Sequence, residues 1–268
     1  MTHQYSPEEL GVMTPGDFRS IVRTGEWTQE TADACTNYGQ ANLIALPQEY
    51  AFEFLLFCNH NPRPCYVVDV TEMGDPHPKL IAPDADIRTD LPRYRIFENG
   101  KIIDEPTDAT AYWRDDLVAF LIGCSWGFVW SFKAANVPYS SLGDYTTNIP
   151  LAQVGRFHGH MVCSCRAFQT SHDAVRAIQI CSRHVAFHGP PVHIGDPRQI
   201  GVENIGSPDA FIPPWPTPPL EPHETVMFWG CGITPQNAVM ASKIPYAITH
   251  YPGHMFVFDK LVEEMAFF

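Results

Sequence analysis

Positive charge is scarce in this sequence. Lys and Arg number 17 against 30 Asp and Glu, which gives a formal net charge of −13. A chain of this charge is repelled by phosphate backbones unless it carries a local basic stripe, and none is visible, so we expect no nucleic-acid partner. Twelve of the 17 basic residues are arginines. The planar guanidinium of arginine binds carboxylate or phosphate through two parallel hydrogen bonds. The composition is therefore still compatible with a small anionic ligand.

The chain also lacks the hydrophobic segments that export or membrane insertion requires. Its first residues have neither the basic start nor the apolar core of a signal peptide. The most apolar uncharged run, 117–132, has 16 residues, fewer than the roughly 18–20 that span a bilayer. We therefore predict a cytoplasmic protein without membrane contact.

Cysteine pairs of the CxxC type are absent, although the chain has eight cysteines. Without a signal peptide, these thiols are most simply explained as reduced and buried in a reducing cytosol. Walker loops, GxGxxG fingerprints and nucleophile elbows are missing as well, so the common nucleotide-binding and hydrolase signatures do not apply.

What the sequence does contain is the pattern of a folded α/β protein. Its 268 residues, 45% of them apolar, suffice for one large domain or two intertwined ones. A helix at 46–59 followed by a buried strand at 65–70 suggests an α/β layer. The other predicted elements are a hairpin over 94–103 with Asn99-Gly100 in its turn, a long buried helix over 113–135, strands over 147–168, a helix capped by Ser171, a strand at 226–229, a helix with Thr234 as N-cap and Pro235 as its first residue, and strands at 247–250 and 255–258.

Six prolines fall within ten residues at 213–222. This composition is typical of a stiff, extended connector or a surface arm. An arm could wrap a partner subunit, which makes a homo-oligomer one expectation. A solvated loop explains the same composition equally well.

The segment Gly230-Cys231-Gly232 lies between a predicted strand and a predicted helix start at Thr234. A helix N-terminus offers free N–H groups and a positive dipole end, so a substrate carboxylate could bind there. Cys231 in this setting is either a nucleophile with a lowered pKa or an ordinary buried thiol. Gln236, in the first turn of the predicted helix, either contacts the ligand or stabilises that helical turn.

Four histidines, His188, His193, His250 and His254, lie in or near turns with glycine and proline, where functional residues concentrate. General acid or base work is one interpretation, and hydrogen-bonded turn histidines are the other. A more specific alternative is a zinc site formed by these histidines with Cys163 and Cys165, but the spacing of these residues matches no known set of zinc ligands. We therefore predict no metal and no cofactor.

Charged residues near predicted strand ends supply further candidates. Glu72 follows a strand among other acidic residues, where crowding can hold a carboxyl protonated and make it a proton donor. Arg93 stands near several aspartates, so an internal salt bridge and ligand clamping are both open. Arg166 and Arg183 lie beside apolar segments, where an unpaired guanidinium is costly, so each is expected to have a carboxylate partner from the protein or a ligand.

These residues belong to a longer series of motifs. The series runs Gln40-Ala41-Asn42-Leu43, Leu46-Pro47, Asp69-Val70-Thr71-Glu72, Asp90-Leu91-Pro92-Arg93-Tyr94, His188-Gly189, Pro191-Val192-His193-Ile194-Gly195-Asp196-Pro197, Phe228-Trp229, Cys231-Gly232, Thr234-Pro235-Gln236 and Pro252-Gly253-His254-Met255. In order, and over nearly the whole chain, it resembles the D-glutamate cyclase family, a hydro-lyase family.

The resemblance implies a fold and an activity. The fold is a three-layer α/β/α sandwich built from 1–82 and 171–268, with a smaller α+β domain inserted at 83–170. The activity closes D-glutamate to 5-oxo-D-proline with loss of water, a cofactor-free step in D-amino acid metabolism.

The chemistry of that reaction suggests roles for the candidate residues, which are hypotheses of ours. A carboxylate must be held and protons must move. The predicted substrate-binding residues are Gln40, Asn42, Arg93, Arg166, Arg183, Thr234 and Gln236. The predicted catalytic residues are Glu72, His188, His193, Cys231 and His254.

Two departures from the family pattern bear on the substrate. Members usually read Thr-Ala-Gly where this chain has Thr31-Ala32-Asp33, and a basic residue usually stands where this chain has Thr146. The lost positive charge favours a less anionic or larger substrate as an alternative. Two further alternatives are a hydrolase that uses Cys231 as nucleophile and a non-catalytic carboxylate-binding protein.

Overall fold

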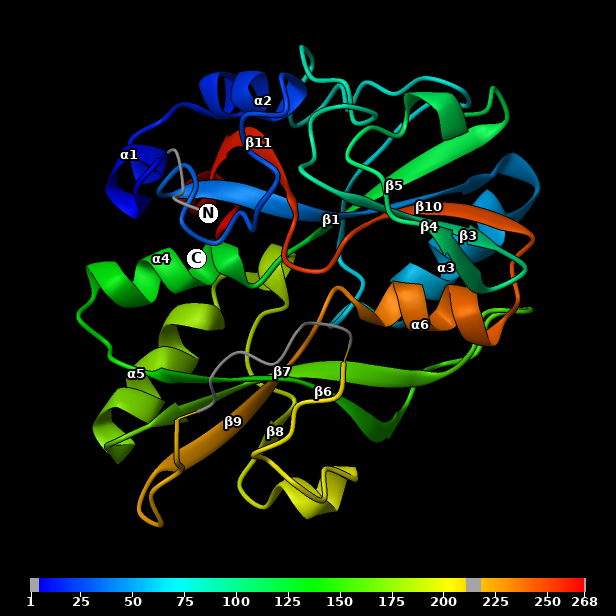
Figure 1. Ribbon diagram of the computed structural model, residues 1–268. Coiled ribbons are helices and arrows are strands. Elements are labelled where there is room, and N and C mark those ends of the chain that lie inside the picture. The colour runs from blue at the N-terminus through cyan, green and yellow to red at the C-terminus, as the bar shows by residue number, and fades with distance from the viewer. Residues whose placement is uncertain (1–4, 211–217, 268) are drawn as a thin grey trace.

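The computed structural model describes residues 5–210 and 218–267, which form two antiparallel β-sheets with helices between and around them (Figure 1). The first sheet has the order β2-β5-β1-β10-β3-β4, with β11 also paired to β1. Its strands are β1 Tyr38–Pro47, β2 Val67–Val70, β3 Tyr94–Glu98, β4 Lys101–Asp104, β5 Leu117–Gly123, β10 Tyr246–His250 and β11 Phe256–Leu261. The second sheet has the order β6-β7-β9-β8, with β6 Ser140–Pro150, β7 His160–Phe168, β8 His193–Ile194 and β9 Thr225–Gly230.

Strand β1 is the centre of the first sheet. It pairs with β5 on one side and with β10 and β11 on the other, and its residues from 39 to 47 are all buried. Burial on both faces explains the mostly apolar sequence of this strand. Gln40 and Asn42 are the polar exceptions, and buried polar side chains need hydrogen-bond partners.

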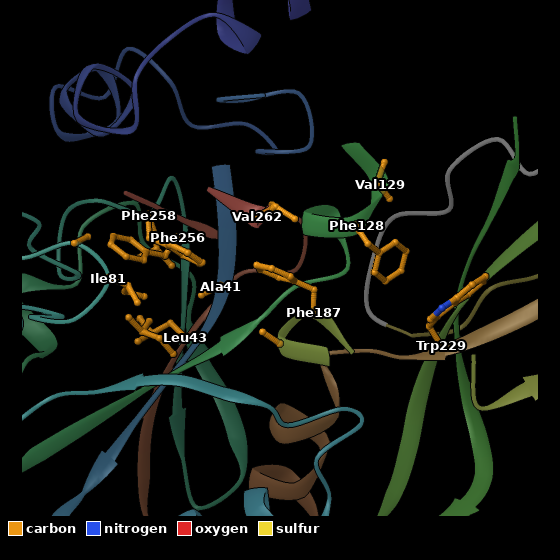
Figure 2. Close-up of a cluster of buried hydrophobic side chains, with 14 of the residues drawn as sticks. Ala41, Leu43, Ile81, Phe128, Val129, Phe187, Trp229, Phe256, Phe258 and Val262 are labelled. Atoms are coloured by element: carbon orange, nitrogen blue, oxygen red, sulfur yellow. The ribbon is translucent and has the colours of Figure 1, made fainter. Parts of the chain in front are cut away.

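Helices occupy the space between the two sheets. They include α3 Gln48–His60, α4 Trp126–Ala134 and α6 Thr234–Ala241, while α5 Ser171–Cys181 lies beside β7 and α4. Figure 2 shows Phe128 of α4 next to Trp229 of β9, with ring centroids 5.8 Å apart, and Leu43 of β1 in the same cluster. Two short helices, α1 Pro7–Gly11 and α2 Pro15–Arg23, lie near β11 (Figure 1). The described residues also form four 3-10 turns: Thr110–Tyr112, Val185–Phe187, Pro197–Ile200 and Val262–Met265.

The predicted α/β class is confirmed, whereas the three-layer α/β/α sandwich is not confirmed. The reason is that helices lie between two antiparallel sheets, and one apolar core cluster contains residues of both sheets and of α4. The division into 1–82 with 171–268 and an insertion at 83–170 stays a prediction. Strands β3 to β5 from that range pair with β1, β2 and β10, and the second sheet is drawn from 140–230.

The predicted helix at 46–59 and the hairpin at 94–103 are confirmed as α3 and β3–β4. In the hairpin turn, Asn99 and Gly100 both have positive φ, at 50° and 74°, which is the geometry that Asn-Gly favours. The closing strands are confirmed as β10 and β11.

The predicted long helix at 113–135 is wrong. Residues 117–123 form strand β5, and only 126–134 form a helix. A continuous apolar run does not distinguish a buried strand from a buried helix, and β5 is buried along its length because it lies between β1 and β2.

Two predicted helix caps also differ by one residue. The N-cap of α5 is Thr170, whose hydroxyl accepts from the Asp173 N–H, instead of Ser171. The N-cap of α6 is Ile233, and the Thr234 hydroxyl instead accepts from the Val162 N–H at 3.0 Å, tying the helix to β7.

Within the described residues, no helix is long and apolar enough to cross a membrane, and the cytoplasmic location stays a prediction. Residues 213–217 of the proline-rich segment lie outside the described residues. Its role in an oligomer therefore also stays a prediction.

Candidate active site

A cavity of about 110 Å³ lies among residues from both sheets and from the segments before α4 and α6. Asn42 and His250 come from the first sheet, and Asp144, Ser164 and Arg166 come from the second. Several polar groups thus converge on a small pocket whose lining surface is otherwise mostly apolar, as in ligand sites.

Arg166 is the cationic group of this cavity. It is 4% exposed, and its Nη1 and Nη2 donate to the hydroxyls of Ser164 at 3.2 Å and Ser125 at 3.1 Å. The guanidinium lies 5.2 Å from the ring centroids of both Phe128 and Trp229. Among the described residues no carboxylate lies within 4 Å of it, and its Nε has no hydrogen-bond partner. A buried cation held only by hydroxyls and rings is set up to bind an anion.

Asp144 reaches the cavity through a β-bulge in β6. The register with β7 shifts between Ser141 and Gly143, and Gly143 has φ of 107°. The extra residue places Ser141 and Asp144 on the cavity side, although they are three positions apart. Burial raises the pKa of Asp144 to about 6, and the charge of Arg166 only partly opposes this. Asp144 can therefore both accept and donate a proton near neutral pH.

Cys231 lies at the same wall, where its thiol interacts with the Asp144 carboxylate. Burial, and then the charge of Asp144, raise the pKa of this thiol well above its ordinary value. The nucleophile hypothesis needs a thiolate. The site instead keeps Cys231 protonated, so that it donates a hydrogen bond to Asp144.

Asn42 is held rigidly at the cavity. Its Nδ2 donates to the carbonyls of Ile122 at 3.1 Å and Gly123 at 3.2 Å. Gly232 packs against it so closely that a Cβ there would stand 2.0 Å from Asn42 Nδ2. A glycine at this position is thus required by the approach of the Asn42 amide.

The other predicted site residues lie elsewhere. Gln40 is bound to Thr31 through both ends of its amide, and His188 is buried with its Nδ1 2.7 Å from the Arg63 carbonyl. Thr234 and Gln236 are buried in α6 behind the cavity wall. Three more line neither this cavity nor the cleft described next: Glu72, which is paired with Lys79, His193, which contacts the Asp196 carbonyl, and Arg183.

A second, open cleft of about 990 Å³ contains Arg93 and His254. Arg93 pairs with Glu105 at 3.4 Å and stacks over the Tyr251 ring at 4.4 Å. Asp33, where the chain departs from the family pattern, also lines this cleft. Since Gly253 lines the inner cavity, the turn at 251–254 separates the two spaces.

Of the predicted residues, the structure therefore brings together Asn42, Arg166 and Cys231. The sequence analysis missed Asp144 and did not select His250. Ser164 could have been found, because it stands two positions before Arg166 on one strand and so shares its face. Asp144 could not, because a bulge breaks the alternation on which such a prediction depends.

Comparison with known proteins gives consistent results. A family model described as D-glutamate cyclase matches residues 118–259. A protein named "Putative hydro-lyase" from Geobacillus kaustophilus is 44% identical over 259 residues, covering 94% of this chain and 97% of its own. "Putative hydro-lyase YcsI" of Bacillus subtilis is 44% identical over 260 residues, with 95% and 99% covered. One from Streptomyces avermitilis is 46% identical over 257 residues, with 94% and 91% covered.

Among solved structures, a nitrogen repressor-like protein from Methanococcus jannaschii aligns over 93% of this chain and 99% of its own. The TM-score is 0.40 and the identity is 10%. At that level the likeness carries no weight for the fold or the function.

Proposed function

This chain belongs to the D-glutamate cyclase family, and from that premise we propose that it closes D-glutamate to 5-oxo-D-proline with loss of water. The relatives carry hydro-lyase names, and the proposed reaction is a hydro-lyase reaction on a small carboxylate. It would place the protein in D-amino acid metabolism.

The observation that carries the proposal is the presence of Arg166 and Asp144 in the lining of one small cavity. Arg166 is a buried cation without a carboxylate partner among the described residues. Asp144 is an acid with its pKa raised to about 6. Together they offer what the reaction needs, namely a fixed charge for the α-carboxylate and a proton carrier for the γ-carboxyl group.

The proton balance of the reaction suits a single acid–base group. D-glutamate brings an ammonium and two carboxylates to the site. When its nitrogen bonds to the γ-carbon, two ammonium protons and one γ-oxygen leave as water, and no other reactant is consumed. Asp144 would relay these protons in turn, accepting each from the nitrogen and passing it to the departing oxygen.

Proton NMR of the purified protein with D-glutamate, L-glutamate and 5-oxo-D-proline in parallel tests the proposal. We expect 5-oxoproline from the D isomer alone and a loss of about 10²- to 10⁴-fold in rate for Asp144→Asn. Asp115→Asn, at an exposed position, is the matched control and should keep full rate. A folded wild-type protein that forms no product from either isomer contradicts the proposal. Stabilisation by carboxylates without turnover would then favour the binding-protein alternative.

A further inference from the structure

His250 is a buried residue of the cavity with an unused hydrogen-bonding atom. It stands at the end of β10 and is 0% exposed, and the cavity contacts it directly. Its Nε2 has no hydrogen-bond partner among the described residues. An unpaired polar atom in a core costs stability, so its retention beside a cavity points to a ligand.

The groups around the other ring nitrogen, Nδ1, indicate where the ring proton lies. Two donors lie near Nδ1, the Leu43 N–H at 3.2 Å and the Gln236 amide nitrogen at 3.5 Å, and one acceptor, the Leu43 carbonyl oxygen, lies at 3.4 Å. Because the nearest of these groups is a donor and donors outnumber the carbonyl, we assign Nδ1 as the acceptor and place the ring proton on Nε2. Gln236 also donates to the His250 carbonyl at 3.0 Å, which holds the backbone of the same residue.

The surroundings keep this ring neutral. Burial lowers the pKa of His250 to about 3, the contact with the Leu43 carbonyl partly opposes this, and the charges of Arg95 on β3 and of His254 act in the same direction as burial. On the cavity side the charged groups are Asp144 and Arg166. The imidazole thus presents an N–H donor that carries no net charge and is not itself titrated at neutral pH.

We propose that His250 is a further catalytic residue, whose Nε2–H donates a hydrogen bond to the γ-carboxyl oxygen that the product retains. This rests on the proposed function. As the nitrogen lone pair forms the C–N bond, the C=O electron pair moves onto that oxygen, where the neutral donor stabilises the developing charge. The pair returns as the other C–O bond breaks and water leaves with the two relayed protons. His250 keeps its own proton throughout, which separates its role from that of Asp144.

This role accounts for Gln236 and explains why it lies behind the cavity wall. Its contacts with the His250 carbonyl and Nδ1 orient the ring, so Gln236 is a positioning residue. With the Gln236 amide and the Leu43 N–H donating toward Nδ1, Nε2 is the ring nitrogen left to donate to a ligand.

A matched pair of variants tests the proposal. His250→Gln places an amide nitrogen near the position of Nε2, whereas His250→Asn places it near Nδ1. We expect kcat to fall about 10²- to 10³-fold in His250→Asn and to be largely restored in His250→Gln, with KM little changed in both. His172→Asn, at a 76% exposed position, is the control. Equal kcat for His250→Asn and the wild type would overturn the proposal.

Nitrogen-15 NMR of histidine-labelled protein gives a readout independent of turnover, with His250→Gln assigning the signal. We expect a neutral ring protonated at Nε2 from pH 5 to 8, and a shift of that nitrogen on addition of 5-oxo-D-proline. A ring protonated at Nδ1 would overturn the proposal. If the wild type fails to cyclise D-glutamate but Nε2 still shifts, the proposed function and the catalytic role fail together and His250 is only a ligand contact. If Nε2 does not shift, His250 contacts no such ligand.

Discussion

At the scale of single residues, Arg166 shows how a residue suited to ligand binding can lower the stability of the free protein. A buried guanidinium without a carboxylate partner lowers the stability of the free protein. We expect Arg166→Met to raise KM for D-glutamate by at least 10-fold, since a hydrogen bond to a charged group is worth about 1.5–3 kcal/mol. The same variant should keep or raise the melting temperature of the free protein, because a desolvated charge is removed and the aromatic contacts remain apolar.

Steady-state kinetics and thermal unfolding check both parts of this prediction. Arg198→Met is the control, because that side chain is 71% exposed and paired with Asp196 at the surface. A drop in melting temperature of several degrees for Arg166→Met, with unchanged KM, would instead make Arg166 a structural residue.

Asp144 gives a prediction about how the stability of the protein depends on pH. The pKa of Asp144 in the folded protein, about 6, lies above the ordinary value of 3.8. The free energy that protonated Asp144 contributes to folding is therefore fully present below pH 3.8 and is lost as the pH rises through 6. Asp144→Asn should therefore be more stable than the wild type above pH 6, on the order of 2 kcal/mol, and similar to it near pH 4. Urea unfolding at pH 4 and 7 measures the difference, and an equal difference at both values would contradict the raised pKa.

The same group sets the activity profile. The reactive state has an ionised Asp144 and a substrate ammonium, so kcat/KM should rise with pH through about 6 and fall as the substrate ammonium deprotonates. A profile flat from pH 5 to 7 would argue that another group relays the proton.

The sequence analysis identified the site residues whose chemical type and sequence neighbours already indicate a role in the site. Arg166 was selected because a guanidinium beside apolar segments needs an anion, and Cys231 because it precedes a helix start. Asp144 was missed, and His250 was considered among four turn histidines but not selected, because their roles depend on the groups around the imidazole and on a bulge that turns the carboxylate inward. Neither feature is visible in residue type or spacing.

At the scale of elements, the bulge in β6 is the feature that positions the acid. Gly143 has φ of 107°, and a Cβ there would meet Pro208 at 2.7 Å. We expect Gly143→Ala to cost about 1–3 kcal/mol of stability and to lower kcat by displacing Asp144. Gly16→Ala, in the first turn of α2 with only Thr14 at 4.0 Å, should be neutral or slightly stabilising. Equal effects of the two substitutions on kcat would show that the bulge does not position Asp144 for catalysis.

Elements with local signals were predictable, and those set by the tertiary environment were not. The buried residues of α3 recur at helical spacing, and the β3–β4 hairpin has Asn99-Gly100 in its turn. The run at 117–132 has no periodicity, so only pairing with β1 and β2 decides that its first half is a strand. The break between β5 and α4 carries Ser125, which binds Arg166, so the misassigned segment contributes to the site.

At the scale of the whole molecule, the cavity joins the two sheets. Asn42 and His250 belong to the first sheet, and Asp144 and Arg166 to the second. A ligand that contacts both should stabilise the protein as a unit, by about 2.7 kcal/mol at 100 times its Kd. We expect 5-oxo-D-proline to slow amide hydrogen exchange in β10 and in β6 and β7 together.

The outer cleft offers the competing location for the same ligand. It is larger than the inner cavity, but its guanidinium, Arg93, is already paired with Glu105, and Glu30 and Asp33 add negative charge that repels a carboxylate. Binding there would slow exchange around Tyr251 without an effect on β6 and β7, and Arg166→Met would leave it intact. Binding in the inner cavity predicts the opposite, namely protection across both sheets that Arg166→Met abolishes. Because one comparison of exchange in the two proteins separates these outcomes, it also decides whether Arg166 or Arg93 is the carboxylate-binding residue.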